Sequence, residues 1–185
     1  TTLDASVLNT LDGNTSGIID ASSITTLTGT ADDLINAYFV SDAVGVVNAS
    51  INGLGNEAVN VNSDTASTSQ ANDLAAATDG VVTATLSDGD MATLAGLTET
   101  GNAYSITITD TSVDAAALNT LDGKTTVAIN AANITTLTGA AADLNTAYDS
   151  SGITGLNDEA ITLSDTTLAA SVLNTLDGHT SGTID

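Results

Sequence analysis

Apolar residues recur at fixed places in five phrases of eleven residues along this chain. Each phrase carries apolar residues at its first, sixth and ninth positions and closes on glycine. In one of them, Val113, Leu118 and Leu121 are spaced as neighbours on a single helix face. We therefore expect a short helix in each phrase, ended by a glycine in the left-handed conformation. The phrases are LDASVLNTLDG (3–13), IDASSITTLTG (19–29), VDAAALNTLDG (113–123), INAANITTLTG (129–139) and LAASVLNTLDG (168–178).

Two further segments are related to each other and also read as helices. They are TADDLINAY (30–38) and AAADLNTAY (140–148), which share Asp, Leu and Tyr at matching places. In the first, Thr30 and Asp33 occupy the positions of a capping box with an acidic third residue. Both segments are therefore predicted to be helical.

Segments between the phrases alternate apolar and polar residues, which is typical of β-strands with one buried face. In YSITITD (104–110), we expect Ile106 and Ile108 to point inward and the threonines between them to point outward. The predicted strand segments are 17–20, 58–64, 81–88, 104–110, 127–130, 160–165 and 182–185.

The six letters LNTLDG occur three times, and their spacing is regular. They close on Gly13, Gly123 and Gly178, so the intervals are 110 residues (123 − 13) and 55 residues (178 − 123). A fixed interval of this size is typical of repeat architectures. Within the 55-residue period we expect coils of about 22 and about 33 residues, each with a strand and a helix, comparable to a leucine-rich repeat.

These lengths predict the α/β class and, within it, a repetitive β/α solenoid. A parallel sheet of about seven strands would lie on one side and short helices on the other. Residues 1–185 would form a single repeat array, with a divergent region at 65–102 and an insertion around Asp42–Asn52. A compact α/β domain is the alternative, but it does not account for the repeated phrase. Because both ends fall inside a repeat, we expect the chain to be a segment of a longer protein.

The charge balance limits the possible partners. The chain has one Lys, no Arg and 23 acidic residues, for a net charge of −22. Such a surface repels nucleic acids and anionic lipid headgroups. No stretch approaches the length of about 20 apolar residues that a membrane span needs, so we expect no membrane insertion. The 42% of apolar residues are enough for a core of small aliphatic side chains.

Candidate catalytic chemistry is scarce in the sequence. His179 is the only histidine, and it takes the variable position of DGxT, where the other copies have Asn14 and Lys124. We therefore expect a solvated loop residue there and no enzymatic activity. Cysteine is absent, which excludes disulfides and thiolate metal sites.

Acidic residues end nearly every predicted strand, and a second row precedes the glycines after the predicted helices. One interpretation is that the first row caps helices and the second shapes turns. The other is that parts of these rows bind Ca²⁺, because closely spaced carboxylates repel unless a cation bridges them. The best calcium candidates are Asp88, Asp110 and Asp165, where the strand pattern is most regular.

The phrases ITTLTG, ADLNTAY, GITGL and AITLSDTTLAASVLNTLDG resemble repeats of very long, acidic, cysteine-free surface proteins of bacteria. Marine cyanobacteria have many such cell-surface and adhesin-like proteins. LNTLDG is also similar to the xELNxLDGVT repeats of bacteriophage tail fibres, although Val7, Ala117 or Val172 replaces the Glu. Both resemblances imply an elongated extracellular structure without chemistry.

We therefore expect a non-enzymatic structural repeat segment of a large extracellular or cell-surface protein, in a filament, sheath, stalk, surface layer or adhesin. A phage tail-fibre module is an alternative. A glycan- or ice-binding surface is another, because outward threonines such as those in ITIT (106–109) form regular pairs. Strand edges and apolar helix faces at the ends of an array need cover. The expected partners are further repeats or copies of the same protein, end to end or side by side.

Overall fold

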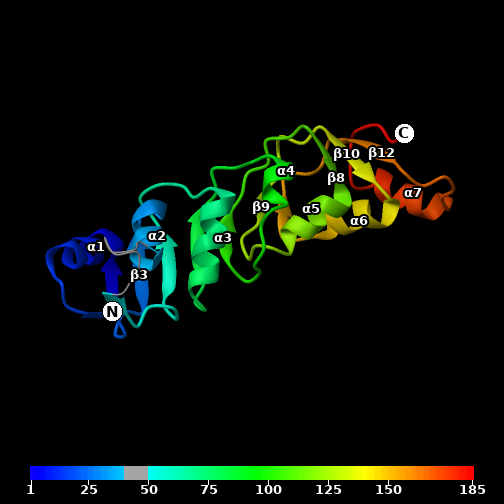
Figure 1. The fold of residues 1–185 in the computed structure, drawn as a ribbon. Helices are drawn as coiled ribbons and strands as arrows, with labels where there is room; N and C mark the ends of the chain where they lie inside the picture. The colour runs from blue at the N-terminus through cyan, green and yellow to red at the C-terminus, as the bar shows by residue number, and fades with distance from the viewer. Residues whose placement is uncertain (40–49) are drawn as a thin grey trace. The chain divides into compact units, whose positions relative to one another are not determined.

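The computed structural model describes residues 1–39 and 50–185 and has two compact units (Figure 1). Unit 1 contains residues 1–87 and 97–104, and unit 2 contains residues 88–96 and 105–185. The described residues form a mixed α/β structure with seven helices and parallel sheets. This confirms the predicted α/β class and the parallel pairing of the strands.

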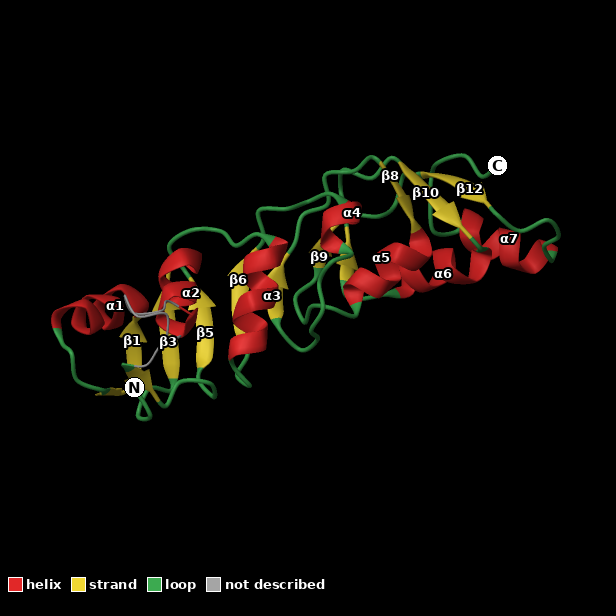
Figure 2. Cartoon of the chain, viewed as in Figure 1, coloured by secondary structure: helices red, strands yellow, loops and turns green. Residues whose placement is uncertain are grey.

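Unit 1 places three helices beside a five-stranded sheet with the order β1-β3-β5-β6-β7. A second sheet pairs β2 with β4 in parallel. Helix α2 packs against both α1 and α3, and Figure 2 shows the three in a row beside the strands. The elements are β1 (Thr2–Asp4), α1 (Ala5–Asn14), β2 (Ile19–Asp20), β3 (Thr26–Gly29), α2 (Ala31–Phe39), β4 (Ile51–Asn52), β5 (Ala58–Val61), α3 (Thr68–Ala77), β6 (Val82–Thr85) and β7 (Ala103–Ser105).

Unit 2 has a three-stranded parallel sheet with the order β12-β10-β8 and a two-stranded sheet, β11-β9. Helix α5 packs against α4 and α6, and α6 packs against α7. The elements are α4 (Met91–Leu94), β8 (Ser112–Asp114), α5 (Ala115–Asp122), β9 (Ile129–Asn130), β10 (Thr136–Gly139), α6 (Ala141–Asp149), β11 (Ile153–Thr154), β12 (Ala160–Leu163) and α7 (Ala170–Asp177). The expectation of one sheet with about seven strands is therefore wrong for the described residues, whose sheets have five, three, two and two strands.

The same order of elements occurs in both units. β1-α1-β2-β3-α2-β4-β5 in unit 1 corresponds to β8-α5-β9-β10-α6-β11-β12 in unit 2. The registers agree as well, since Thr2 pairs with Thr26 in one unit and Ser112 with Thr136 in the other. Each partner lies 24 residues further along the chain (26 − 2 and 136 − 112). In these two series, α1, α2, α5 and α6 each connect a strand of the larger sheet of their unit to a strand of the smaller one.

Two of the five phrases that were predicted as helices are not helical. Residues 19–29 contain β2, a turn and β3, and residues 129–139 contain β9, a turn and β10. Both end in ITTLTG, whose Thr and Ile side chains are β-branched and favour strands. Leu27 and Leu137 are fully buried from the middle of these strands. The Ile–Leu spacing that suggested a helix comes from a turn residue followed by a strand residue.

The remaining phrases are helical, but their ends differ from the expectation. Asp4 and Asp114 are the N-caps of α1 and α5, each accepting a hydrogen bond from a backbone N–H of the first turn. Gly123 and Gly178 end α5 and α7 with φ of −67° and −76°, which is not the left-handed conformation. The left-handed region is used instead by glycines outside the helices, such as Gly53, with φ of +91°.

Helices α2 and α6 confirm the prediction for segments 30–38 and 140–148. The Thr30 hydroxyl accepts a hydrogen bond from the Asp33 N–H at 3.0 Å, as the capping signal indicated. The divergent region 65–102 holds α3 and α4. Most of the insertion predicted around Asp42–Asn52 lies outside the described residues.

The core consists of small aliphatic side chains, with Tyr104 as its one large aromatic among the described residues. Ile106 and Ile108 are buried, while Thr107 and Thr109 are exposed, as the alternating pattern predicted. The longest helices of the described part have ten residues, and none has the length and apolar character of a membrane span.

Candidate functional site

Two of the three predicted calcium ligands cap helices. The Asp110 carboxylate accepts a hydrogen bond from the Met91 N–H, at the start of α4, at 2.7 Å. The Asp165 carboxylate accepts one from the Ala141 N–H, at the start of α6, also at 2.7 Å. A carboxylate at a helix N-terminus satisfies a free N–H and opposes the positive end of the helix dipole. Asp88 lies, partly exposed, in the loop between β6 and α4.

Asp64 adds a cap of the same kind that the sequence did not single out as a calcium candidate. Its carboxylate accepts a hydrogen bond from the Ala31 N–H, at the start of α2, at 3.0 Å. Asp64 follows β5, and Asp165 follows β12, the corresponding strand of unit 2. In both units, therefore, an aspartate shortly after one strand caps the helix that follows the neighbouring strand. Within the described ranges, no three His, Cys, Asp or Glu side chains are grouped so that they could hold a metal ion.

Other acids shape turns or cap their own helices. The Ser22 hydroxyl and backbone N–H both donate to the Asp20 carboxylate and lower its pKa. The Thr93 N–H donates to Asp90, the N-cap of α4, and lowers the pKa of that carboxyl group. In the second row, Asp122 accepts a hydrogen bond from the Ser150 hydroxyl at 2.6 Å.

The most unusual groups are two buried glutamates. The chain has only three Glu, and two of them, Glu57 and Glu159, are 2% and 0% exposed. A buried carboxylate is costly unless hydrogen bonds replace its water. Glu57 accepts hydrogen bonds from the Tyr38 hydroxyl and from the N–H groups of Gly55 and Asn56.

Glu159 has corresponding partners. It accepts hydrogen bonds from the Tyr148 hydroxyl and the Asn157 N–H, both at 3.0 Å. Burial, together with the neighbouring glutamate, raises the pKa of Tyr148, and the same causes raise that of Tyr38. Both phenols therefore remain hydrogen-bond donors at neutral pH.

A threonine and a glycine complete each cluster by contacting the backbone of the glutamate. The hydroxyls of Thr78 and Thr180 donate to the backbone carbonyls of Glu57 and Glu159, each at 2.7 Å. Each hydroxyl also accepts a hydrogen bond, from the N–H of Gly80 at 3.0 Å or Gly182 at 2.9 Å. These glycines lie so close to the glutamate backbone that a Cβ on either would come within 2.2 Å of the carbonyl oxygen. The two clusters are therefore alike in side chains and in backbone approach.

Sequence reasoning missed both clusters, although a signal was present. GLGNEAVN (53–60) and GLNDEAIT (155–162) share a Glu between a turn and a strand, in a chain where Glu is rare. The two glutamates are 102 residues apart (159 − 57), whereas their tyrosines are 110 apart (148 − 38). Unit 1 thus has eight more residues between tyrosine and glutamate, so a comparison at one fixed interval does not align both residues.

The asparagine of LNTLDG connects neighbouring helices. The side-chain amides of Asn9 and Asn119 donate to the backbone carbonyls of Asp33 and Asp143, each at 2.9 Å. These carbonyls belong to the third residue of α2 and α6, the helices that follow α1 and α5. In these two copies, the repeated phrase therefore hydrogen-bonds its own helix to the next one.

A polar groove in unit 2 lies beside this link, between α5 and α6. It has a volume of about 460 Å³ and is lined by Asn119, Asp122, Asn145, Thr146, Asp149 and Ser150. The buried Oδ1 atoms of Asn119 and Asn145 have no hydrogen-bond partner among the described groups. The lining is rich in oxygen acceptors, but its carboxylates do not gather as a metal site.

His179 packs against the second glutamate cluster. Its ring stacks on Tyr148 with the centroids 5.1 Å apart and the planes 2° from parallel. Its Nε2 atom lies 3.7 Å from Asp149 Oδ1. His179 lies in the turn after α7, as predicted, but its side chain is only partly solvated, because the aromatic face of Tyr148 covers one side of the imidazole.

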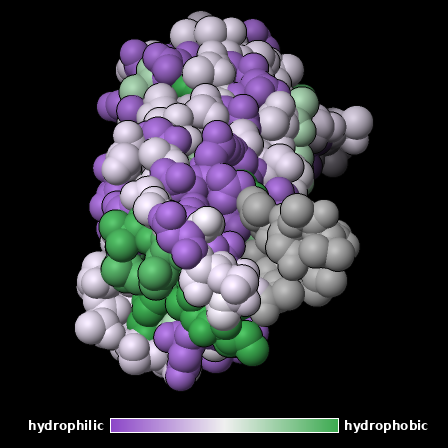
Figure 3. All heavy atoms as spheres, turned by 60° about the vertical axis from the view of Figure 1, so that its left-hand side comes forward, coloured by the Kyte–Doolittle hydropathy of each residue, from purple (hydrophilic) through white to green (hydrophobic). Residues whose placement is uncertain are grey.

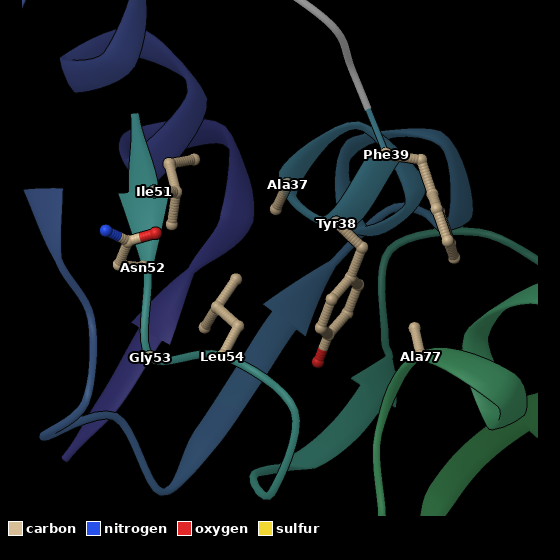
Figure 4. A pocket seen from close by; sticks show the side chains of 8 residues that line it. All are labelled: Ala37, Tyr38, Phe39, Ile51, Asn52, Gly53, Leu54 and Ala77. Atoms are coloured by element: carbon tan, nitrogen blue, oxygen red, sulfur yellow. The ribbon is translucent and has the colours of Figure 1, made fainter. Parts of the chain in front are cut away.

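Unit 1 has a pocket next to the corresponding tyrosine, Tyr38 (Figure 4). Its volume is about 310 Å³, and its lining includes Phe39, Leu54 and Ala77. Ala77 takes the place of His179, since both lie three residues before the cluster glycine. The pocket thus lies where unit 2 has the stacked imidazole.

Comparison of the chain with protein-family models gave no match, and neither did comparison with curated proteins or with solved structures.

Proposed function

We propose that the chain is a non-enzymatic structural repeat segment of a large extracellular surface protein, with the role of a filament, sheath, stalk, surface layer or adhesin. The observation that carries this proposal is the recurrence of the Tyr–Glu–Thr–Gly cluster in both units with the same hydrogen bonds. Its glutamates and threonines are buried and its tyrosines are half-buried, and their hydrogen bonds to each other stabilise backbone positions. They serve the fold and not a bound substrate.

The proposal includes a β/α solenoid, in which the repeating segments stack along one axis. The links between successive segments favour it. Asn9 and Asn119 tie each helix to the next, and Asp64 and Asp165 cap the helix of a neighbouring segment. Interactions between nearest neighbours of this kind stabilise repeat arrays.

An extracellular location suits the charge of −22 and the absence of cysteine. A high net charge keeps long repeat proteins soluble and apart from each other. A chain without thiols forms no unwanted disulfides in an oxidising medium. The location can be tested directly on intact cells.

Antibodies raised against the purified chain provide that test. We expect immunogold labelling on intact, unpermeabilised cells of the source organism, and loss of the labelling after brief treatment with an external protease. An antibody against a cytoplasmic enzyme is the control and should label only opened cells. Labelling of virions would favour the phage-fibre alternative. Labelling restricted to the cell interior would contradict the proposal.

The solenoid is tested by lengthening the chain. A variant with a second copy of residues 113–167, one 55-residue period, should have a larger maximum dimension in small-angle X-ray scattering. Two added strands at about 4.8 Å and two added helices at about 8–10 Å set the expected increase at roughly 10–20 Å. A second duplication should add the same amount again. An increase that falls with each copy would indicate compact domains instead.

A further inference from the structure

The two leucines of LNTLDG differ in exposure among the three copies. In α5 both are buried, in α1 only the first is buried, and in α7 only the second is buried. The first leucines, Leu8, Leu118 and Leu173, are 2%, 0% and 41% exposed, and the second, Leu11, Leu121 and Leu176, are 51%, 3% and 0% exposed.

The neighbouring helices account for this difference. Helix α5 has a helix on each side, since it packs against α4 before it and α6 after it. Helix α7 packs against α6, which precedes it, and α1 packs against α2, which follows it. The first leucine therefore faces the following helix, and the second faces the preceding helix. The three copies together therefore show which side of the phrase packs against the preceding helix and which side packs against the following helix.

Helix α1 presents an open surface on the side of the preceding helix. Leu11 on this side is 51% exposed, and Val7, which lines the same hollow, is 55% exposed. This hollow of about 360 Å³ is lined by Ser6, Val7, Thr10, Leu11 and Asn14. Figure 3 turns this side of the molecule forward and shows a patch of apolar surface among hydrophilic residues. We call Val7 and Leu11 the α1 face.

The leucine on the matching side of unit 2 is covered, whereas Ala117, the counterpart of Val7, is exposed. Leu121, which corresponds to Leu11, is 3% exposed, and Ile129, which corresponds to the half-buried Ile19, is fully buried. The cover comes from α4 and from the strand-like segment that contains Ile106 and Ile108, whose backbone hydrogen-bonds to Asn130. Unit 2 therefore shows how such a face is covered, namely by another helix and an extended segment of the same chain.

Helix α7 presents the opposite surface, that of a helix without a successor in the described chain. Leu173 is 41% exposed there, and Asn174 is also exposed. The counterparts of Asn174, which are Asn9 and Asn119, donate to the carbonyl of the third residue of the next helix. The third residue of α1 is Val7. We call Leu173 and Asn174 the α7 face.

We propose that the α1 face of one copy of this chain docks on the α7 face of a second copy. Leu11 then lies against α7 as Leu121 lies against α4, and Asn174 reaches the Val7 carbonyl. Because the two faces differ, a dimer still has one free α1 face and one free α7 face, so assembly continues beyond the dimer. The inference rests on the proposed structural role, since it extends the stacking of segments from one chain to the next.

The charge predicts how this docking depends on salt. Two copies that each carry a net charge of −22 repel at low ionic strength. Added salt screens the repulsion and strengthens apolar contact. Association should therefore increase with NaCl, whereas association through ion pairs would decrease.

The test uses the 185-residue chain and two variants that each block one face. Sedimentation velocity in 0.5 M NaCl should show masses above the dimer for the wild type at high concentration. Leu11→Glu and Leu173→Glu should each need at least a tenfold higher concentration to associate, because a charge replaces the central apolar contact. An equimolar mixture of the two variants should form dimers and nothing larger, since it contains only one competent pair of faces.

Val81→Glu is the matched control, because Val81 is 49% exposed but lies outside both faces. It should associate like the wild type. A wild type that stays monomeric, or single variants that assemble as well as it does, would overturn the docking proposal. Surface labelling of cells does not depend on this contact, so failure here leaves the test of the structural role intact.

Discussion

The Tyr148 hydroxyl donates a hydrogen bond to Glu159 Oε2 across 3.0 Å, inside a core where Glu159 has no exposed surface. Tyr148→Phe removes this donor and keeps the ring that stacks on His179. Because a bond to a carboxylate is lost, the free energy of unfolding should fall by about 1.5–3 kcal/mol. Urea denaturation followed by circular dichroism measures the change.

Tyr104→Phe is the control for this variant. Tyr104 is more deeply buried than the half-buried Tyr148, and its hydroxyl donates to the neutral carbonyl of Ala71, at 3.3 Å. A loss of about 1 kcal/mol or less is expected. Equal losses for the two variants would show that the carboxylate has no special part in the cluster.

The tyrosines also determine stability at alkaline pH. Burial, with a smaller contribution from Glu99, raises the pKa of Tyr104 to about 12. An unfolded tyrosine loses its proton near pH 10, so above that pH the unfolded chain binds fewer protons than the folded one. Stability should be unaffected by these groups below pH 10 and fall between pH 10 and 12. Absorbance at 295 nm should show little phenolate at pH 11 in the folded chain, against nearly full ionisation in urea.

Gly80→Ala tests the close approach at the other glutamate. The new Cβ would lie 2.2 Å from the Glu57 carbonyl oxygen, so the backbone would have to move. We expect a loss of about 3 kcal/mol or more, and Gly182→Ala should behave alike. Gly13→Ala is the matched control, since nothing lies within 4 Å of its Cβ position in α1. It should gain about 0.5–1 kcal/mol, and thermal melting would separate the two outcomes clearly.

Asp165→Ala tests the caps between segments. Helix α6 starts at Ala141 after Ala140, which has no capping side chain, so Asp165 supplies the hydrogen bond. Its loss should cost about 0.5–2 kcal/mol. Asp73→Ala changes the same charge at an exposed site in α3 and should stay within about 0.5 kcal/mol of the wild type. Similar losses in both would mean that net charge and not capping is responsible.

The calcium prediction for Asp88, Asp110 and Asp165 has its own experiment. Calcium takes six to eight oxygen ligands, whereas Asp110 and Asp165 each serve a helix N-terminus. We therefore expect CaCl₂ and NaCl of equal ionic strength to shift the melting temperature equally, and EDTA to have no further effect. A larger shift with calcium that disappears in Asp110→Asn or Asp165→Asn would restore the calcium interpretation.

The sequence predicted the helices and strands whose periodicity runs long enough to be unambiguous. Segments 30–38 and 140–148 carry helical spacing over a full helix, the first also carries a start signal, and both are helices. ITTLTG is shorter, and only one apolar side chain of each strand, Leu27 or Leu137, is buried. One buried residue cannot distinguish a period of two from a period of 3.6. The β-branched threonines were the better guide there.

The glutamate clusters were beyond reach for a different reason. Whether a carboxylate can be buried depends on the donors that surround it, and these come from distant positions. Glu57 needs Tyr38, 19 residues earlier, and its carbonyl needs Thr78, 21 residues later. Single-sequence patterns describe neighbours within a few residues, so only comparison of the two copies could have revealed the set.

The caps between segments have a consequence for synthesis on the ribosome. The Ala31 N–H can donate to Asp64 only after the ribosome has added 33 more residues, and the Ala141 N–H can donate to Asp165 only after 24 more. At about 5–20 residues per second, translation needs roughly one to seven seconds to deliver these carboxylates, while a helix can form within microseconds. The first N–H groups of α2 and α6 therefore stay without this carboxylate for seconds after each helix is made. Folding of such a chain would therefore be completed from the N-terminus onward, since the helix of one segment is capped only after the next segment has been made.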